Sequence, residues 1–246
     1  MNLSFIGEFF QIFLYQPLFN ALVLIYNLLP GHDLGLAVIA LTFIIKLSTL
    51  PLNVRAFKLQ QAMARIQPQL KEAQKQYKDR PAEQARVMSE IFKKEKVNPW
   101  SSFVPLLIQF PILIALYQLF LSGLWGQQNH LYSFIVRPEV ISPQFLGLVD
   151  LSQPNLWLAI LAGLGQLAQS LVTPLNPGQT DKDDPRYQIN KMIQKQMIFF
   201  LPFLTVFILL KLPSALGLYW LATSFLTAGQ QYFLNKRYPL VEPSSK

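Results

Sequence analysis

Five long apolar stretches dominate this sequence and restrict what it can fold into. A helix needs about 20 apolar residues to cross the hydrocarbon of a bilayer. The stretches have close to that length: Leu34–Asn53, Trp100–Leu124, Asn155–Thr173, Met197–Pro213 and Ser214–Phe233. Charged residues make up only 14% of the 246 residues, against about 25% in globular proteins. The sequence therefore predicts an all-α membrane protein with a five-transmembrane-helix bundle.

The N-terminal segment is also apolar, but polar residues and a proline interrupt it: Gln11, Gln16, Pro17 and Asn20. A helix with such a mixed surface suits the membrane interface. We therefore expect residues 1–33 to form an external, interfacial amphipathic segment. A sixth span, which would reverse the N-terminus, is the alternative. The opening MNLSFIGEFF lacks the basic residue that starts a secretory signal.

Basic residues gather on one side of the predicted bundle. Of the 21 Lys and Arg residues, eleven fall in 55–98, four in the loop 174–196 and three in the tail 235–246. The long loop 125–154 has only Arg137. Cytoplasmic loops carry an excess of Lys and Arg, so the basic segments are expected on the cytoplasmic side. With five spans, one at 34–54 and four within 99–234, this places the N-terminus outside and the C-terminus in the cytoplasm. The loop 174–196 and the short tail then lie in the cytoplasm, and the loop 125–154 lies outside.

Residues 55–98 show a different pattern, with apolar residues spaced alternately by four and three: Leu59, Met63, Ile66, Leu70, Ala73 and Tyr77. This is the seam of a coiled coil. Pro68 is expected to break the first helix and begin a new one. The sequence KDRP (78–81) predicts a turn, and a second helix is expected from about Ala82. Together these features predict a basic cytoplasmic coiled-coil hairpin.

Lys46 is the exception within the first span, LTFIIKLSTLPLNVR (41–55). A charge at the centre of a bilayer helix costs about 2.5 to 3.5 kcal/mol on insertion scales. Lys46 lies seven residues from the cytoplasmic end, roughly 10 Å, which exceeds the reach of a snorkelling lysine. A water-filled cavity open to the cytoplasm is the other interpretation and the one we favour. No Asp or Glu falls within a predicted span to pair with Lys46, so the ammonium could receive an anion from elsewhere.

Polar side chains at a similar depth are the candidates to line this cavity: Thr42, Thr49, Gln109, Gln118, Gln166, Gln169, Thr223, Ser224 and Gln230. Signatures of catalysis are missing. There is no cysteine, and the two histidines, His32 and His130, fall in external loops, so a metal site is not expected. No P-loop, GxSxG elbow or HExxH motif occurs. We expect no enzyme activity and no cofactor.

Three segments, in this order, resemble the YidC/Oxa/Alb family of membrane protein insertases in its short form. They are IIKLSTLPLNVRAFKLQQAMARIQPQLKEAQKQY, VNPWSSFVPLLIQFPILIALYQLF and LPSALGLYWLATSFLTAGQQYF. The resemblance covers the chain from about Gln16. It implies five spans behind an external amphipathic helix, in the plasma (inner) membrane of a bacterium. It also implies a hydrophilic groove that is open to cytoplasm and lipid and closed outside.

The resemblance also implies which residues line that groove. Most members carry an arginine where this chain has Lys46, which keeps the charge but loses the planar guanidinium fork. By position, Gln109, Gln169, Trp220 and Gln230 match groove residues of the family, and Ser224 stands where an asparagine is common.

The implied clients are nascent membrane proteins with short hydrophilic tails. The hairpin 55–98 would meet anionic membrane lipids, a targeting receptor, the ribosome or the general secretory translocon, and nucleic acid is not expected as a substrate. Two other functions remain open: a small transporter or proton-conducting protein with Lys46 as a relay, and a folding partner of the translocon that does not itself insert clients.

Overall fold

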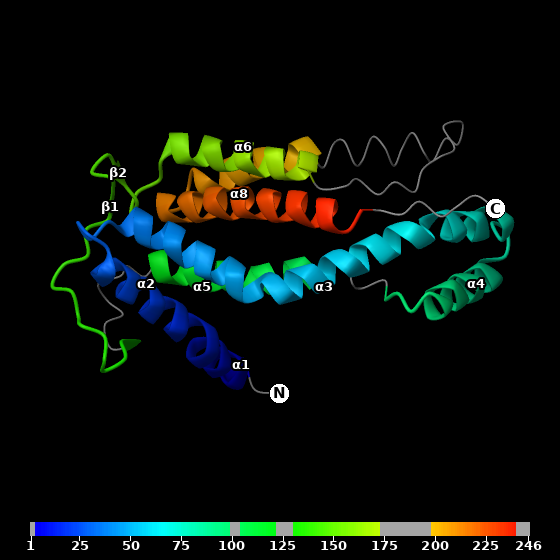
Figure 1. Cartoon of the computed structure of the whole chain (residues 1–246), viewed down its shortest axis with the longest axis horizontal. Helices are drawn as coiled ribbons and strands as arrows, with labels where there is room; N and C mark the ends of the chain where they lie inside the picture. The colour runs from blue at the N-terminus through cyan, green and yellow to red at the C-terminus, as the bar shows by residue number, and fades with distance from the viewer. Residues whose placement is uncertain (1–2, 99–103, 122–129, 173–197, 240–246) are drawn as a thin grey trace.

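The computed structural model describes residues 3–98, 104–121, 130–172 and 198–239 (Figure 1). Apart from two strands of two residues each, the regular structure in these ranges is helical. Apolar helices recur among them: Gly7–Leu28, Leu34–Gln76, Leu107–Leu121, Leu156–Val172 and Ile198–Leu209. The first two are long and apolar enough, by length and composition, to cross a membrane. The described chain is therefore all-α in character, as expected for a membrane protein. The loop 174–196, most of the tail 235–246 and the start of the second predicted span lie outside the described residues.

The N-terminal segment is helical throughout its described length. Helix α1 (Leu3–Phe10) continues through a π-helical turn (Gln11–Tyr15) into α2 (Gln16–Leu28). Asn20 is buried and joins this segment to the following loop, since its side chain donates to the His130 carbonyl (2.8 Å) and accepts from the Tyr132 amide (2.7 Å). The polar residues that interrupt the apolar pattern here therefore include one with a structural role.

Helix α3 (Leu34–Gln76) runs unbroken for 43 residues and forms the long axis of the molecule (Figure 1). Asp33 caps it, accepting a hydrogen bond from the Leu36 amide (2.8 Å). The prediction that Pro68 starts a new helix is wrong, because α3 continues through both Pro51 and Pro68. An internal proline costs about 3 kcal/mol or more. Pro68 is exposed, and Ile66 and Leu70 on either side are buried.

Helix α4 (Pro81–Lys94) follows a short turn and folds back along α3 (Figure 1). The turn at 78–81 and the helix after it are as predicted. A small apolar cluster joins α4 to α3 and contains Ile66, Leu70 and Val97, with Met63, Met88 and Phe92 packed against them. These contacts use part of the predicted seam, and they hold the two helices together at the end of α3 furthest from Leu34.

The remaining helices lie beside the first half of α3: α5 (Val104–Leu121), α6 (Leu156–Val172), Ile198–Leu209 and α8 (Ser214–Arg237). Strands β1 (Gln144–Phe145) and β2 (Val149–Asp150) pair antiparallel near the start of α3 (Figure 1). A tight turn separates Leu209 from Ser214. Helices α6 and α8 approach closely at Gly165, where an added methyl group would lie 3.1 Å from the Leu221 side chain.

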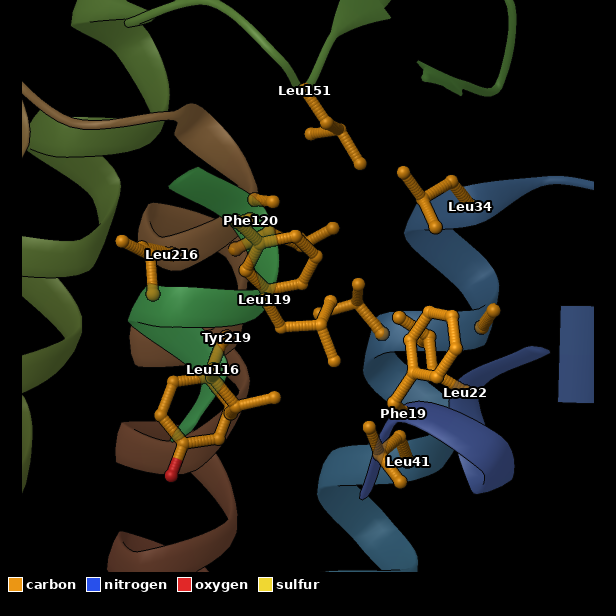
Figure 2. Packing of buried hydrophobic residues seen from close by; sticks show 14 of the residues in the cluster. Phe19, Leu22, Leu34, Leu41, Leu116, Leu119, Phe120, Leu151, Leu216 and Tyr219 are labelled. Atoms are coloured by element: carbon orange, nitrogen blue, oxygen red, sulfur yellow. The ribbon is translucent and has the colours of Figure 1, made fainter. Parts of the chain in front are cut away.

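A hydrophobic cluster occupies one end of this bundle (Figure 2). It takes Phe19 and Leu22 from α2, and Leu34 and Leu41 from the start of α3. The end of α5 adds Leu116, Leu119 and Phe120. The start of α8 adds Leu216 and Tyr219. The cluster therefore lies at the same end as the β1–β2 hairpin, away from α4.

Candidate functional site

A cavity of about 400 Å³ lies beside the hydrophobic cluster, between α3, α5, α6 and α8. Apolar atoms form the larger part of its surface, but most of the residues that line it carry a polar group: Lys46, Thr49, Asn53, Gln60, Gln109, Gln166, Gln169, Tyr219, Trp220, Thr223, Ser224, Thr227, Gln230 and Gln231. Such a lining is unusual in a bundle whose outer surface carries exposed residues such as Leu107, Phe203 and Phe225.

The lining follows from helical geometry. On α3 the lining positions Lys46, Thr49, Asn53 and Gln60 are separated by three, four and seven residues, which places them on one face. On α8 the lining positions from Tyr219 to Leu234 recur at the same spacing. Each helix therefore turns one polar stripe toward the cavity, and the stripe on α3 extends about 21 Å from Lys46 to Gln60 at 1.5 Å per residue.

Lys46 lies at the inner end of this stripe and is partly buried. Across residues 3–98, 104–121, 130–172 and 198–239, no carboxylate forms an ion pair with its ammonium group. None of the described residues that line the cavity is an Asp or Glu. The described surroundings of Lys46 thus leave its charge open to an anion that enters the cavity.

Two hydrogen-bonded links tie the helices together around the cavity. The first joins α5 to α8, since Gln109 Nε2 donates to the Tyr219 hydroxyl. Figure 2 shows this hydroxyl pointing away from the hydrophobic cluster while the ring packs within it. Tyr219 therefore stands at the boundary between the apolar cluster and the polar cavity.

The second link centres on Gln166 of α6. Its Oε1 atom accepts from Thr205 Oγ1 (2.6 Å) and from Trp220 Nε1 (3.1 Å). One carbonyl oxygen can accept two hydrogen bonds, so both buried donors are satisfied. By contrast, the buried Gln231 Nε2 has no hydrogen-bond partner within the described chain, and it lines the same cavity. A polar guest could satisfy it.

The hydrophobic cluster closes one end of the cavity. On α3 the cluster ends at Ile45 and the cavity begins at Lys46, and on α8 both meet at Tyr219. On α5 the cluster residues lie beyond Ile112, whereas the polar wall is at Gln109. The inward faces of α3 and α8 are thus apolar near β1–β2 and mostly polar toward α4, and α5 contributes Gln109 to the polar part. The cavity is one-sided.

Most of the residues predicted for the groove come together here: Lys46, Thr49, Gln109, Gln169, Trp220, Ser224 and Gln230. Gln166 and Thr223, which the sequence also suggested, join them. Thr42 does not line the cavity: it is 1% exposed in the apolar half of α3, and its hydroxyl donates to the Val38 carbonyl (2.6 Å). Gln118 is also absent from the lining. The role of the assembled residues in binding a client stays a prediction.

Sequence reasoning missed several lining residues: Asn53, Gln60, Tyr219, Thr227 and Gln231. Their helical spacing from Lys46 and Thr223 is the signal that could have found them. Within the described ranges, no group of three His, Asp or Glu side chains could hold a metal ion.

Comparison with known proteins identifies the family. Residues 24–241 match the model described as 60Kd inner membrane protein. A protein from Endomicrobium trichonymphae named "Membrane protein insertase YidC" is 32% identical over 225 residues, which are 92% of this chain and 40% of that protein. Proteins of the same name from Syntrophus aciditrophicus and Francisella tularensis subsp. novicida are 30% and 32% identical over 90% and 83% of the chain.

This chain spans about two fifths or less of the length of those relatives, at 40%, 36% and 33%. The match to the family, by contrast, extends over nearly all of the chain, including every segment that lines the cavity. The chain therefore belongs to the 60Kd inner membrane protein family, that of the YidC/Oxa/Alb membrane protein insertases, whose YidC members are multi-pass proteins of the bacterial inner membrane.

Proposed function

We propose that this protein inserts other proteins into the membrane, and that the one-sided polar cavity is where it receives a client's hydrophilic tail. The family supports membrane insertion as the activity. The single observation that carries the proposal is the division of the inward faces of α3 and α8 into an apolar part and a mostly polar part. A polar segment can enter such a cavity from one side only and stops at the apolar cluster.

The cavity would lower the energy barrier to translocation of the client's hydrophilic tail, because it shortens the apolar distance that the tail must cross. The hydrocarbon core of a bilayer is about 30 Å thick, and Lys46 lies roughly 10 Å from the cytoplasmic end of the first span. A tail that reaches Lys46 would then have roughly 20 Å of apolar protein left to cross. The membrane potential, positive outside, would pull an acidic tail outward by about 2.3 kcal/mol per charge per 100 mV. No nucleotide is needed in this scheme.

Lys46 would attract the acidic residues of the tail. Its position at the closed end of the cavity, with no described carboxylate partner, favours a transient ion pair with the client over a permanent internal one. The client's apolar segment would meanwhile leave sideways into lipid, gaining about 0.3 to 0.6 kcal/mol per central Leu, Ile, Phe or Val.

The proposed membrane topology has five spans, with the N-terminus outside and the C-terminus in the cytoplasm. The β1–β2 end of the bundle then faces outward and α4 lies in the cytoplasm. The domain limits proposed from sequence go with this topology, with residues 1–33 interfacial and 55–98 a cytoplasmic hairpin. Since α3 is continuous across residue 54, the first span and the hairpin would share one rigid helix.

The proposed partners follow from the same topology. Clients are nascent membrane proteins with short hydrophilic tails. The hairpin 55–98 carries eleven Lys and Arg residues, which suits anionic lipid, a targeting receptor or the ribosome, and the secretory translocon is a further proposed partner.

Reconstitution tests the proposal most directly. A labelled single-span client with a short acidic tail is added to liposomes that contain only this protein, and protease protection measures how much tail reaches the lumen. We expect translocation above that of protein-free liposomes, and above that of liposomes with an unrelated five-span protein. Translocation at the level of these controls would contradict direct insertion and leave the role of a folding partner.

Ion flux through the same liposomes separates insertion from transport. A proton or solute pathway needs several ionisable groups across the membrane. Among the described residues that line the cavity, Lys46 and Tyr219 are the ionisable ones, and an apolar cluster lies beyond Lys46. We expect no proton flux above the protein-free rate. Flux that depends on Lys46 would favour the transporter.

A further inference from the structure

A second hollow lies beside the polar cavity and is apolar. It has a volume of about 340 Å³ and lies between α5, the helix Ile198–Leu209 and the start of α8. Its lining consists of Phe110, Leu113, Ile114, Tyr117, Thr205, Ile208, Leu209, Leu212, Leu216 and Trp220. We call it the apolar cleft. Phe110 is 56% and Ile208 46% exposed at its rim, so in a membrane this rim faces the acyl chains of the lipid.

The apolar cleft and the polar cavity share two lining residues, Leu113 of α5 and Trp220 of α8. These two side chains therefore form the wall between a compartment that suits hydrocarbon and one that suits water. Both are partly buried. If the wall moved, hydrocarbon could enter the polar cavity beside Gln109 and Gln166.

Gln166 holds the Trp220 half of this wall. Its carbonyl oxygen accepts from the Trp220 indole nitrogen (3.1 Å), which keeps the polar edge of the ring next to a residue that lines the polar cavity. The same oxygen accepts from Thr205 (2.6 Å), a residue of the apolar cleft that is only 6% exposed. Gln166 thus satisfies the polar atoms on both sides of the wall, and neither needs water from the polar cavity.

We propose that Trp220 and Leu113 form a partition that keeps lipid acyl chains in the apolar cleft out of the polar cavity, and that Gln166 is the positioning residue that holds Trp220 in place. The occupant of the apolar cleft is then lipid hydrocarbon. The proposal rests on the proposed function in one respect: a cavity that receives a polar tail must stay wet.

Fluorescence of Trp220 tests the partition without measuring insertion. A single-tryptophan parent is made by changing the other three to phenylalanine: Trp100, Trp125 and Trp157. It is reconstituted in phosphatidylcholine liposomes whose acyl chains carry bromine, which quenches only within the hydrocarbon, and is compared with unbrominated liposomes. Acrylamide, added in a separate titration, reports access from water.

In Gln166→Leu we expect the population of conformers in which the Trp220 indole has left its place in the wall to rise about fivefold. This factor corresponds to the loss of one ordinary hydrogen bond. Quenching by brominated chains should rise accordingly. Gln166→Glu keeps an oxygen acceptor and should retain the parent value. Gln169→Leu is the matched control: it removes another cavity amide from α6, one turn away, without touching the Trp220 hydrogen bond.

Leu113→Ala provides a second route that does not depend on Gln166. It shortens the other half of the wall, so quenching by brominated chains should rise here too while the indole hydrogen bond stays. If neither Gln166→Leu nor Leu113→Ala raises acyl-chain quenching, or if Gln169→Leu raises it as much, the partition is refuted. Because quenching is independent of client insertion, this outcome is distinct from failure of the proposed function.

Discussion

The charge of Lys46 should control insertion of acidic tails more than insertion of neutral ones. A carboxylate 4 Å from an ammonium gains about 1 kcal/mol in bulk water and about 4 kcal/mol at an effective dielectric constant of 20. The polar cavity lies between these limits, because most of the residues that line it carry a polar group and the apolar cluster closes one end. Even the lower limit corresponds to about a fivefold effect on binding.

Two substitutions separate charge from shape at this position. Lys46→Met keeps a long flexible side chain without charge, and Lys46→Arg keeps the charge. The assay compares two clients in liposomes that differ only in the tail, which carries either Asp or Asn at the same positions. We expect Lys46→Met to lower the Asp-to-Asn ratio of insertion rates by at least about fivefold, and Lys46→Arg to preserve it.

The controls test whether the effect is local and electrostatic. Lys211→Met makes the same change at an exposed lysine whose ammonium lies 5.2 Å from the Phe207 ring, outside the cavity, and should leave the ratio unchanged. Raising the salt concentration should reduce the Asp preference of the parent, since the screening length falls to about 3 Å at 1 M. An unchanged ratio in Lys46→Met would refute the role given to this charge. Equal slowing of both clients would instead indicate damaged packing.

Two further predictions concern stability, measured by thermal unfolding in detergent. A methyl group at Gly35 would lie 2.7 Å from the Phe145 Cβ atom, so Gly35→Ala should cost about 1 to 3 kcal/mol through overpacking, and Phe145→Ala in the same chain should restore part of the loss. If Phe145→Ala gives no recovery, the clash is not the cause. Gly163→Ala should also destabilise, because the new methyl would lie 3.2 Å from a backbone oxygen and overlap a valine side chain. Gly217→Ala is its control: the nearest atom would be at 3.6 Å, so this change should be neutral or stabilise by up to about 1 kcal/mol. Equal losses in these two variants would contradict the packing described for α6.

Local patterns predicted the helices well and their interruptions less well. The turn after Gln76 agrees with the prediction from KDRP, whose proline disfavours continuation of the helix. Pro68 has equally strong breaking chemistry, yet α3 passes through it. The difference lies in tertiary contacts, since Ile66 and Leu70 pack against Val97 and α4. The sequence shows that these residues are apolar, but it does not show that they pack against one another.

For the candidate groove, too, local sequence patterns do not show which residues meet in the packed structure. Thr42 and Thr49 are both within four residues of Lys46, and the sequence offers no reason to prefer either. Only the packed bundle places Thr49 on the polar cavity and Thr42 among apolar residues. Similarly, Gln166 and Trp220 are 54 positions apart, and no local pattern indicates that one holds the other.

The sequence by itself determined that the chain is helical and apolar, that it carries one cation within its first long apolar stretch, and that no acidic residue accompanies this cation in the predicted spans. These properties follow from hydropathy, composition and spacing, which act over a few helical turns. The tertiary structure decided that polar stripes from several helices share one cavity and that apolar halves close it at one end. Whether a side chain meets water or hydrocarbon depends on which neighbouring helix faces it, and that is fixed only when the helices pack.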